Sequence, residues 1–192
     1  MKKLILLFIT TSFVLSQNLI WSVDEKYENG NIKAISYHQK IWQKIELVKK
    51  ETYYENGQIK REGNIKDDEL DGKWTWYYEN GQIHIEGNYK DGKRDGKRNR
   101  YYKNGQIKWE ENYKDGERDG KSTDYYEDGQ IRSEGNYKDD MKDGKYTFYL
   151  ENGKIRTERN YKDGKEDGKV TYYYEDGSID SVEEWKDGEL VE

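Results

Sequence analysis

The chain has 192 residues, of which 32% are hydrophobic and 39% are charged, and its formal net charge is -6. The acidic balance argues against nucleic acid or anionic lipid as a partner, and the absence of cysteine excludes disulfides, thiolate metal sites and a cysteine nucleophile. Aromatic residues make up 15% of the chain, with 19 Tyr and 6 Trp, which favours a folded protein over a disordered one.

The first segment, residues 1–16, has the layout of a secretory signal peptide. Lys2 and Lys3 precede an apolar run from Leu4 to Leu15, and the small residue Ser16 follows. The run is shorter than the roughly 20 residues that a membrane-spanning helix needs. We therefore predict an exported protein that is periplasmic, attached to the cell surface or secreted.

Residues 17–52 contain one partial copy of a repeated pattern, KYENGNIK, which starts at Lys26. The rest of this segment departs from the pattern but carries apolar residues such as Ile35, Tyr37 and Trp42. We predict that it forms an N-terminal cap with one degenerate repeat.

Residues 53–192 repeat one pattern every 24 residues: YYENGQIKREGN starts at Tyr53 and YYENGQIHIEGN at Tyr77. Each copy has two runs rich in Tyr, Thr, Ile and Trp joined by Asn-Gly or Asp-Gly, which is the pattern of a β-hairpin. A single hairpin cannot bury its aromatic face, whereas a row of them can. The fold class predicted is all-β, an elongated open array of stacked antiparallel hairpins.

The alternation of side chains along a strand gives a register for each hairpin. With Asn80-Gly81 as a two-residue loop, Tyr78 lies opposite Ile83 and Trp76 lies opposite Ile85. One face then carries Trp74, Trp76, Tyr78, Ile83, Ile85, Gly87 and Tyr89, and the other carries Thr75, Tyr77, His84, Glu86 and Asn88. This register predicts cation–π pairs of Tyr53 with Lys60 and of Tyr101 with Lys108. A three-residue loop with a bulge is the alternative.

Catalytic chemistry has little support in the sequence. The two histidines, His38 and His84, are far apart in the chain, and the second occupies a repeat position that Lys, Arg and Asp take elsewhere. The row Glu62, Glu86, Glu110, Glu134 and Glu158 is interpreted as structural, pairing with neighbouring cations, and the Asp-Gly turns lack the ligand spacing of calcium loops. We expect no catalytic, cofactor or metal site, no enzyme activity and no small-molecule substrate.

The positions that differ between copies indicate where a partner could bind. Position 74 is followed at the same place in later copies by Arg98, Ser122, Tyr146 and Val170. Such variation suggests that the ladder does not use these positions for its own packing. The candidate partner-binding residues are Trp74, Trp76, Tyr78, Ile85 and Trp109, as an exposed aromatic cluster. The competing interpretation is that they cap the stack or pack in a dimer.

The repeat resembles the bacterial variant of the MORN repeat family. The motif is Tyr-Tyr, two residues, Gly, one residue and Ile, then Glu-Gly-Asn-Tyr-Lys-Asp-Gly-Lys and Asp-Gly-Lys, and it is complete in residues 77–97. The resemblance covers about 53–192, although the longer eukaryotic pattern with Gly-x-Trp is not fully reproduced. It implies a twisted antiparallel sheet of hairpins and a non-enzymatic binding or scaffolding role, with a protein partner or self-association. Some variant-repeat proteins are labelled antitoxins, which fits poorly with export.

A second resemblance is to the aromatic hairpin repeats of choline- and glucan-binding cell-wall modules. These also contain WYY, which here begins at Trp76, followed by a glycine turn. Their repeats are shorter and open with Gly-Trp, which is absent here. This resemblance implies a cell-surface glycan-binding module as the alternative function.

Overall fold

The computed structural model describes residues 6–7 and 19–191, and it divides into two compact units, residues 1–93 and 94–192. Apart from the short strand β1 (Leu6–Leu7), the predicted signal peptide lies outside the described residues. In the described part of the chain every regular element is a strand, and no helix there could cross a membrane.

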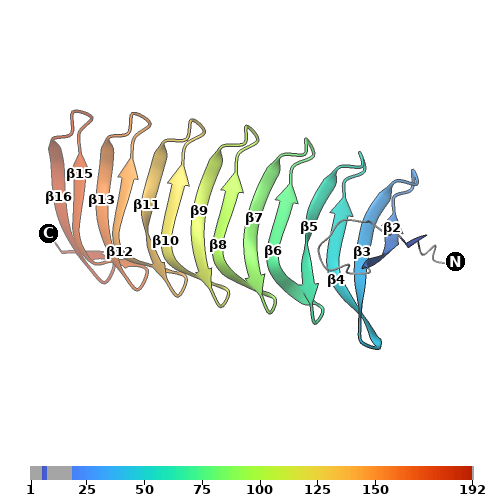
Figure 1. Ribbon diagram of the computed structural model, residues 1–192. Coiled ribbons are helices and arrows are strands. Elements are labelled where there is room, and N and C mark those ends of the chain that lie inside the picture. The colour runs from blue at the N-terminus through green and yellow to red at the C-terminus, as the bar shows by residue number, and fades with distance from the viewer. Residues whose placement is uncertain (1–5, 8–18, 192) are drawn as a thin grey trace, which may run out of the picture. The chain divides into compact units, whose positions relative to one another are not determined.

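The strands of the first unit follow one another in chain order, each antiparallel to the next (Figure 1). They are β2 (Leu19–Lys26), β3 (Ile32–Ile41), β4 (Lys44–Tyr53), β5 (Ile59–Lys66), β6 (Glu69–Tyr77) and β7 (Ile83–Lys90). β1 pairs with β2.

The strands of the second unit repeat the arrangement. They are β8 (Lys93–Tyr101), β9 (Ile107–Lys114), β10 (Glu117–Tyr125), β11 (Ile131–Lys138), β12 (Met141–Tyr149), β13 (Ile155–Lys162), β14 (Lys165–Glu166), β15 (Gly168–Tyr173), β16 (Ile179–Lys186) and β17 (Glu189–Leu190). The prediction of an all-β open array of antiparallel hairpins is therefore confirmed.

Two kinds of turn connect the strands. At one end Asp91 and Gly92 both have positive φ, 48° and 75°, as a two-residue type I′ turn requires. At the other end the Tyr78 amide donates to the Gln82 carbonyl at 2.8 Å, and the Gly81 amide donates to the Tyr78 carbonyl at 2.9 Å. Only Gly81 has positive φ there, 83°. This is the three-residue loop with a left-handed glycine, so the predicted two-residue Asn80-Gly81 loop is wrong.

The loop changes the register next to it, but not along the strands. Trp76 lies opposite Ile85 as predicted, whereas Ile83 lies opposite Tyr77 rather than Tyr78. One extra residue, His84, forms a β-bulge between these pairs and restores the predicted register. The equivalent bulge residues are Lys60, Lys108, Arg132, Arg156 and Asp180. The isoleucine row therefore shares a face with the first tyrosine of each Tyr-Tyr pair.

Because of the bulge, the observed cation–π pairs differ from the predicted ones. Lys60 Nζ lies 5.5 Å from the ring centroid of Tyr54, and Lys108 Nζ lies 5.2 Å from that of Tyr102. In each case the partner is the second tyrosine of the pair, not Tyr53 or Tyr101, because the bulge turns the cation to the other face. His84 stacks in the same way on Tyr78, with centroids 4.2 Å apart.

We name the two faces of the sheet by their residues, separately for each unit. Face A carries Gly63, Trp74, Trp76, Ile85 and Tyr89 in the first unit, and Trp109, Glu111, Tyr113, Arg118, Ser122, Tyr137, Lys142, Tyr146, Phe148, Arg159, Tyr161 and Tyr172 in the second. Face B carries Thr75, Tyr77 and Ile83 in the first unit, and Glu110, Tyr125, Glu134, Tyr149, Glu158 and Tyr173 in the second.

Face B is held together by a group of three side chains that recurs along the sheet. The Tyr149 hydroxyl donates to Glu134 at 2.8 Å, and Lys121 Nζ lies 2.8 Å from the other oxygen of the same carboxylate. Hydrogen bonds from Lys121 and then from Tyr149 hold the pKa of Glu134 below its ordinary value. The same group occurs as Tyr77–Glu62–Lys49, Tyr125–Glu110–Lys97 and Tyr173–Glu158–Lys145. The glutamate row is therefore structural, as predicted.

The second tyrosine of each pair makes a contact in the opposite direction along the chain. The Tyr126 hydroxyl donates to the Tyr149 carbonyl at 2.8 Å, one repeat further on. Tyr54 reaches Tyr77 and Tyr102 reaches Tyr125 in the same way. The Tyr125-Tyr126 pair thus binds the preceding repeat with its first hydroxyl, through Glu110, and the following repeat with its second, which favours a constant period.

Face A packs by matching large side chains with glycine. Trp74 lies opposite Gly63, where a Cβ atom would be 2.2 Å from the indole ring. Gly135 leaves the same room for the ring of Tyr146, since a Cβ atom there would be 2.1 Å away. Where the residue is small, as at Ser122, the opposite residue is the larger Glu111. Variation at this position is therefore compensated across the strand pair.

Candidate interaction surface

Trp74 is part of the core of the first unit. Its side chain is only 2% exposed, its indole Nε1 donates to the Asn64 carbonyl at 2.8 Å, and its ring lies 5.9 Å from that of Trp76. The premise that Trp74 is an exposed contact residue is therefore wrong. The sequence signal for burial was Gly63, which lies in the preceding repeat.

The other predicted residues of the first unit are partly accessible. Trp76 is half-buried, lies opposite Ile85 and approaches Tyr89 with ring centroids 6.0 Å apart. Tyr78 is half-buried beside His84. Trp76, Ile85 and Tyr89 thus form an apolar patch on face A.

Trp109 belongs to the second unit, where it lies between charged residues, with Asp124 opposite it on β10. It lies opposite Arg100, and the Arg98 guanidinium carbon lies 5.1 Å from its ring centroid. Trp109 is half-buried. The ring is therefore one member of a series of cation–π contacts.

Those cations are the feature of face A that the sequence interpretation missed. Arg94 lies 5.2 Å from the ring centroid of Tyr113, and Arg118 lies 4.0 Å from that of Tyr137. Lys142 Nζ lies 4.7 Å from that of Tyr146. Arg94, Arg118 and Lys142 recur at the repeat spacing, each just after a turn. The regular spacing of these cations could have indicated the cation–π contacts from the sequence, but the prediction considered only the aromatic residues.

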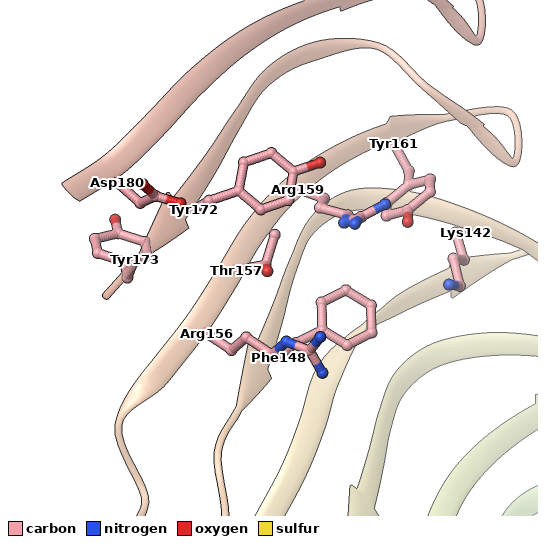
Figure 2. A pocket seen from close by; sticks show the side chains of 9 residues that line it. All are labelled: Lys142, Phe148, Arg156, Thr157, Arg159, Tyr161, Tyr172, Tyr173 and Asp180. Atoms are coloured by element: carbon pink, nitrogen blue, oxygen red, sulfur yellow. The ribbon is translucent and has the colours of Figure 1, made fainter. Parts of the chain in front are cut away.

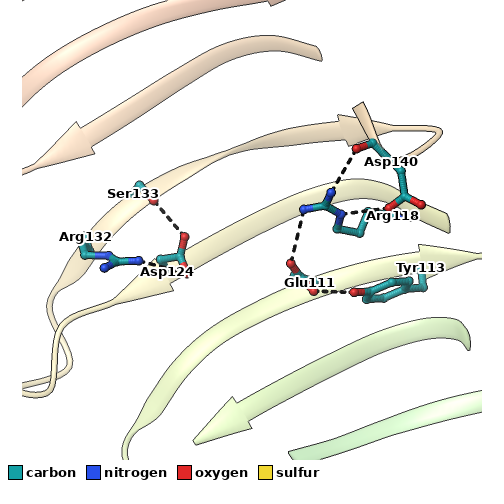
Figure 3. Close-up of polar contacts among 7 residues, drawn as sticks. All are labelled: Glu111, Tyr113, Arg118, Asp124, Arg132, Ser133 and Asp140. Atoms are coloured by element: carbon teal, nitrogen blue, oxygen red, sulfur yellow. Dashed lines mark hydrogen bonds and ion pairs between the residues drawn. The ribbon is translucent and has the colours of Figure 1, made fainter. Parts of the chain in front are cut away.

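Arg118 is held on both sides by carboxylates (Figure 3). Its Nε donates to Asp140 Oδ1 at 3.0 Å, and its guanidinium lies 4.0 Å from Glu111. Glu111 in turn accepts a hydrogen bond from Tyr113 at 2.7 Å. Hydrogen bonds from the Arg118 amide and then from its side chain hold the pKa of Asp140 below its ordinary value. This cation is neutralised within the chain.

A second polar group on the same face joins Asp124 to two neighbours. Asp124 accepts a hydrogen bond from Ser133 at 3.1 Å and lies 3.7 Å from Arg132 (Figure 3). Ser133 is buried, so this contact satisfies a polar group within the sheet. We interpret it as structural.

An open cavity of about 590 Å³ lies further along face A of the second unit (Figure 2). Its lining residues are Lys142, Phe148, Arg156, Thr157, Arg159, Tyr161, Tyr172, Tyr173 and Asp180. Arg159 is paired with Glu166 at 2.5 Å, and its guanidinium lies 5.8 Å from the ring centroid of Phe148. Burial, and then the positive charge of Arg159, lower the pKa of Lys142. The cavity combines rings with cations.

The polar groups on both faces of the sheet are engaged with neighbouring side chains. The glutamates of face B are engaged with Tyr and Lys, and His84 stacks on a tyrosine. Within residues 6–7 and 19–191, no cluster of three or more His, Asp or Glu is placed to hold a metal ion. The rings and cations of face A are groups that can contact a partner through cation–π and ionic interactions.

Comparison with models of known protein families shows which family the chain belongs to. The profile described as MORN repeat variant matches six consecutive segments, residues 48–67, 70–91, 94–115, 118–139, 142–163 and 166–187, which make up well over half of the chain. The chain belongs to the MORN repeat variant family. Comparison with curated proteins finds no matching sequence. Each matched MORN segment from residue 70 onward starts at or next to the strand that follows a short turn, so a segment contains one complete hairpin.

Proposed function

We propose that this MORN repeat protein is exported and acts without enzymatic activity, binding another protein or a second copy of itself through face A. What carries the proposal is the difference between the two faces. Face B repeats the same Tyr–Glu–Lys group, and its side chains bind one another. Face A changes from repeat to repeat and presents half-buried rings and cations. A surface that varies on a constant scaffold is suited to recognising a partner.

The test is a binding experiment with purified protein. The mature chain, immobilised, is presented with the envelope fraction of its own cells, and the protein captured is identified, purified and titrated. Trp76→Ala with Trp109→Ala should weaken that affinity at least tenfold, because half-buried aromatic residues dominate interfaces. Glu127→Gln, at an exposed turn, is the matched control. Equal affinity of the double variant and wild type would contradict the proposal.

A cell-surface glycan-binding module is the second candidate, and the half-buried rings of Trp76, Trp109 and Tyr172 on an open sheet favour it. Sugars stack on such rings, and stacking changes tryptophan emission. Titration of intrinsic fluorescence with cell-wall polysaccharides separates the two candidates, since the protein-partner proposal predicts no change. An antitoxin-type role, in which the partner is a toxin protein, would appear instead as a captured toxin.

A further inference from the structure

We propose that the cavity around Lys142 binds a carboxylate on an acidic peptide segment of the partner. The inference rests on the proposed function, since it names the chemistry that face A recognises in the second unit. Its basis is a comparison of Lys142 with Arg118, which occupies the same position one repeat earlier.

Arg118 and Lys142 have the same backbone setting. Each lies in the strand that follows a short turn, directly opposite a tyrosine: Arg118 opposite Tyr113 and Lys142 opposite Tyr137. The carbonyl of each accepts a hydrogen bond from the next turn, at 3.0 Å in both cases. The two cations therefore start from equivalent places on face A.

The carboxylates that neutralise Arg118 are missing at Lys142. Arg118 is bound by Glu111 and Asp140. One repeat later these two positions are Gly135 and Gly164, neither of which has a side chain. Among the described residues, no carboxylate forms an ion pair with Lys142. Rings take their place: Lys142 Nζ lies 4.7 Å from the centroid of Tyr146, 4.8 Å from Tyr161 and 5.7 Å from Phe148.

The charges around the ammonium leave room for an anion. Arg159 and Arg118 repel the Lys142 ammonium, while Glu166 and Asp124 attract it from a distance. Glu166 is already bound to Arg159, and Asp124 to Ser133 and Arg132. Arg156 and Asp180, both exposed, line the same cavity (Figure 2), and Asp180 is hydrogen-bonded to Tyr174. A half-buried cation without a counterion gains from an incoming carboxylate more than an exposed one does, because water screens it less.

The shape of the site favours a peptide side chain over a free ion. The cavity is open to solvent along the sheet, and Phe148 and Tyr172 supply ring surface beside the cations. A glutamate side chain would place its methylene groups on these rings and its carboxylate at Lys142. The ligand class is therefore an acidic segment in which carboxylates are flanked by apolar groups.

The test uses the full chain and a rhodamine-labelled peptide of alternating Glu and Ala, acetylated and amidated at its ends. Binding of the peptide is measured by fluorescence anisotropy at low and at moderate salt. The matched peptide has Gln in place of Glu. Lys142→Met keeps the apolar stem among the rings and removes the charge, and it should weaken binding of the Glu peptide at least tenfold. Lys138→Met, at an exposed lysine on the same sheet, is the control and should leave binding unchanged.

A second variant restores the missing carboxylate. Gly164 has a φ of 82°, so the aspartate in Gly164→Asp carries backbone strain, but the Asp139-Asp140 turn already holds Asp140 at a φ of 64°, and a Cβ atom at Gly164 would meet Met141 at an ordinary 3.5 Å. The new aspartate should neutralise Lys142 from within and weaken the Glu peptide several-fold, while the fold is kept.

The outcomes separate this inference from the function on which it rests. Preference for the Glu peptide, lost in Lys142→Met and reduced in Gly164→Asp, supports the site. Equal binding of the Glu and Gln peptides overturns it, as does full binding by Lys142→Met. In either of these cases a captured protein partner that still depends on Trp76 and Trp109 would leave the proposed function standing.

Discussion

Replacing Gly135 with alanine tests the packing of face A most directly. The added Cβ would lie 2.1 Å from Cδ2 of Tyr146 and 2.3 Å from Cε2, where ordinary contact begins at 3.4 Å. The ring would have to move by more than an ångström. It has no space to do so, because it is 4% exposed and its centroid lies 5.9 Å from those of Tyr137 and Phe148 and 5.7 Å from that of Tyr161.

Two effects of opposite sign set the magnitude. Overpacking of this kind costs about 1–3 kcal/mol, and the depth of the overlap points to the upper end. Gly135 has no positive φ, so alanine also gains about 0.5–1 kcal/mol by reducing the freedom of the unfolded chain. We expect Gly135→Ala to lower the free energy of unfolding by about 2 kcal/mol.

The same substitution in a Tyr146→Ser background is the matched control. That background copies Ser122, which lies opposite a residue with a side chain. The clash is then gone, so Gly135→Ala should be neutral or stabilising by about 0.5 kcal/mol. The assay is urea unfolding followed by circular dichroism for all four proteins. The reasoning is refuted if Gly135→Ala costs the same with and without the tyrosine ring.

Three further predictions concern single side chains. Trp74→Ala should lower the free energy of unfolding by about 3–5 kcal/mol, because it removes a buried ring and its hydrogen bond. Urea unfolding measures the loss, and a loss below about 1 kcal/mol would show that the ring is not part of the core. Leu150→Tyr should stabilise by about 0.5–1.5 kcal/mol, since the tyrosines at equivalent positions bind the carbonyl one repeat on, and Leu150→Phe, which lacks the hydroxyl, is the control. Burial and then the hydrogen bond to Glu62 raise the pKa of Tyr77 to about 12. The hydrogen-bonded Tyr77 hydroxyl therefore stabilises the fold below pH 10, the ordinary tyrosine pKa, and this stabilisation is lost as the pH rises through about 12. Tyr77→Phe should remove one tyrosine that ionises near pH 12 from an ultraviolet absorbance titration. An unchanged titration near pH 12 would contradict this.

The main features of the fold could be predicted from the sequence because the repeat supplies several independent signals. Period-2 alternation, Gly-containing turns and the strict spacing all indicate hairpins, and the glutamate row was interpreted correctly from its regularity. The loop type could not be decided, because Asn80-Gly81 fits either a two-residue turn or the left-handed end of a three-residue loop. The bulge at His84 depends on that choice, so the local register next to the loop was wrong as well.

The candidate surface was harder to predict, because burial on face A is decided across repeats. Trp74 looks like a free ring within its own repeat, and only Gly63 in the preceding one shows that the ring lies flat on the backbone. The setting of Lys142 likewise depends on Gly135, which lies in β11, and on Gly164, which lies in the turn between β13 and β14. Aligning the repeats position by position shows which residues are substituted. Which side chains these substitutions bring into contact can be read only from the strand pairing.

The central claim is that the Tyr–Glu–Lys groups of face B stabilise the array, whereas Lys142 on face A is available to bind a partner, and one paired measurement tests it. Glu134→Gln and Lys142→Met are each assayed for the free energy of unfolding and for affinity to the Glu peptide. Glu134→Gln should lose about 1–2 kcal/mol of stability, since it weakens charged hydrogen bonds at a partly exposed site, and keep its affinity. Lys142→Met should keep its stability and lose affinity at least tenfold. The claim is contradicted if the two properties fall together in both variants, or if the roles are reversed.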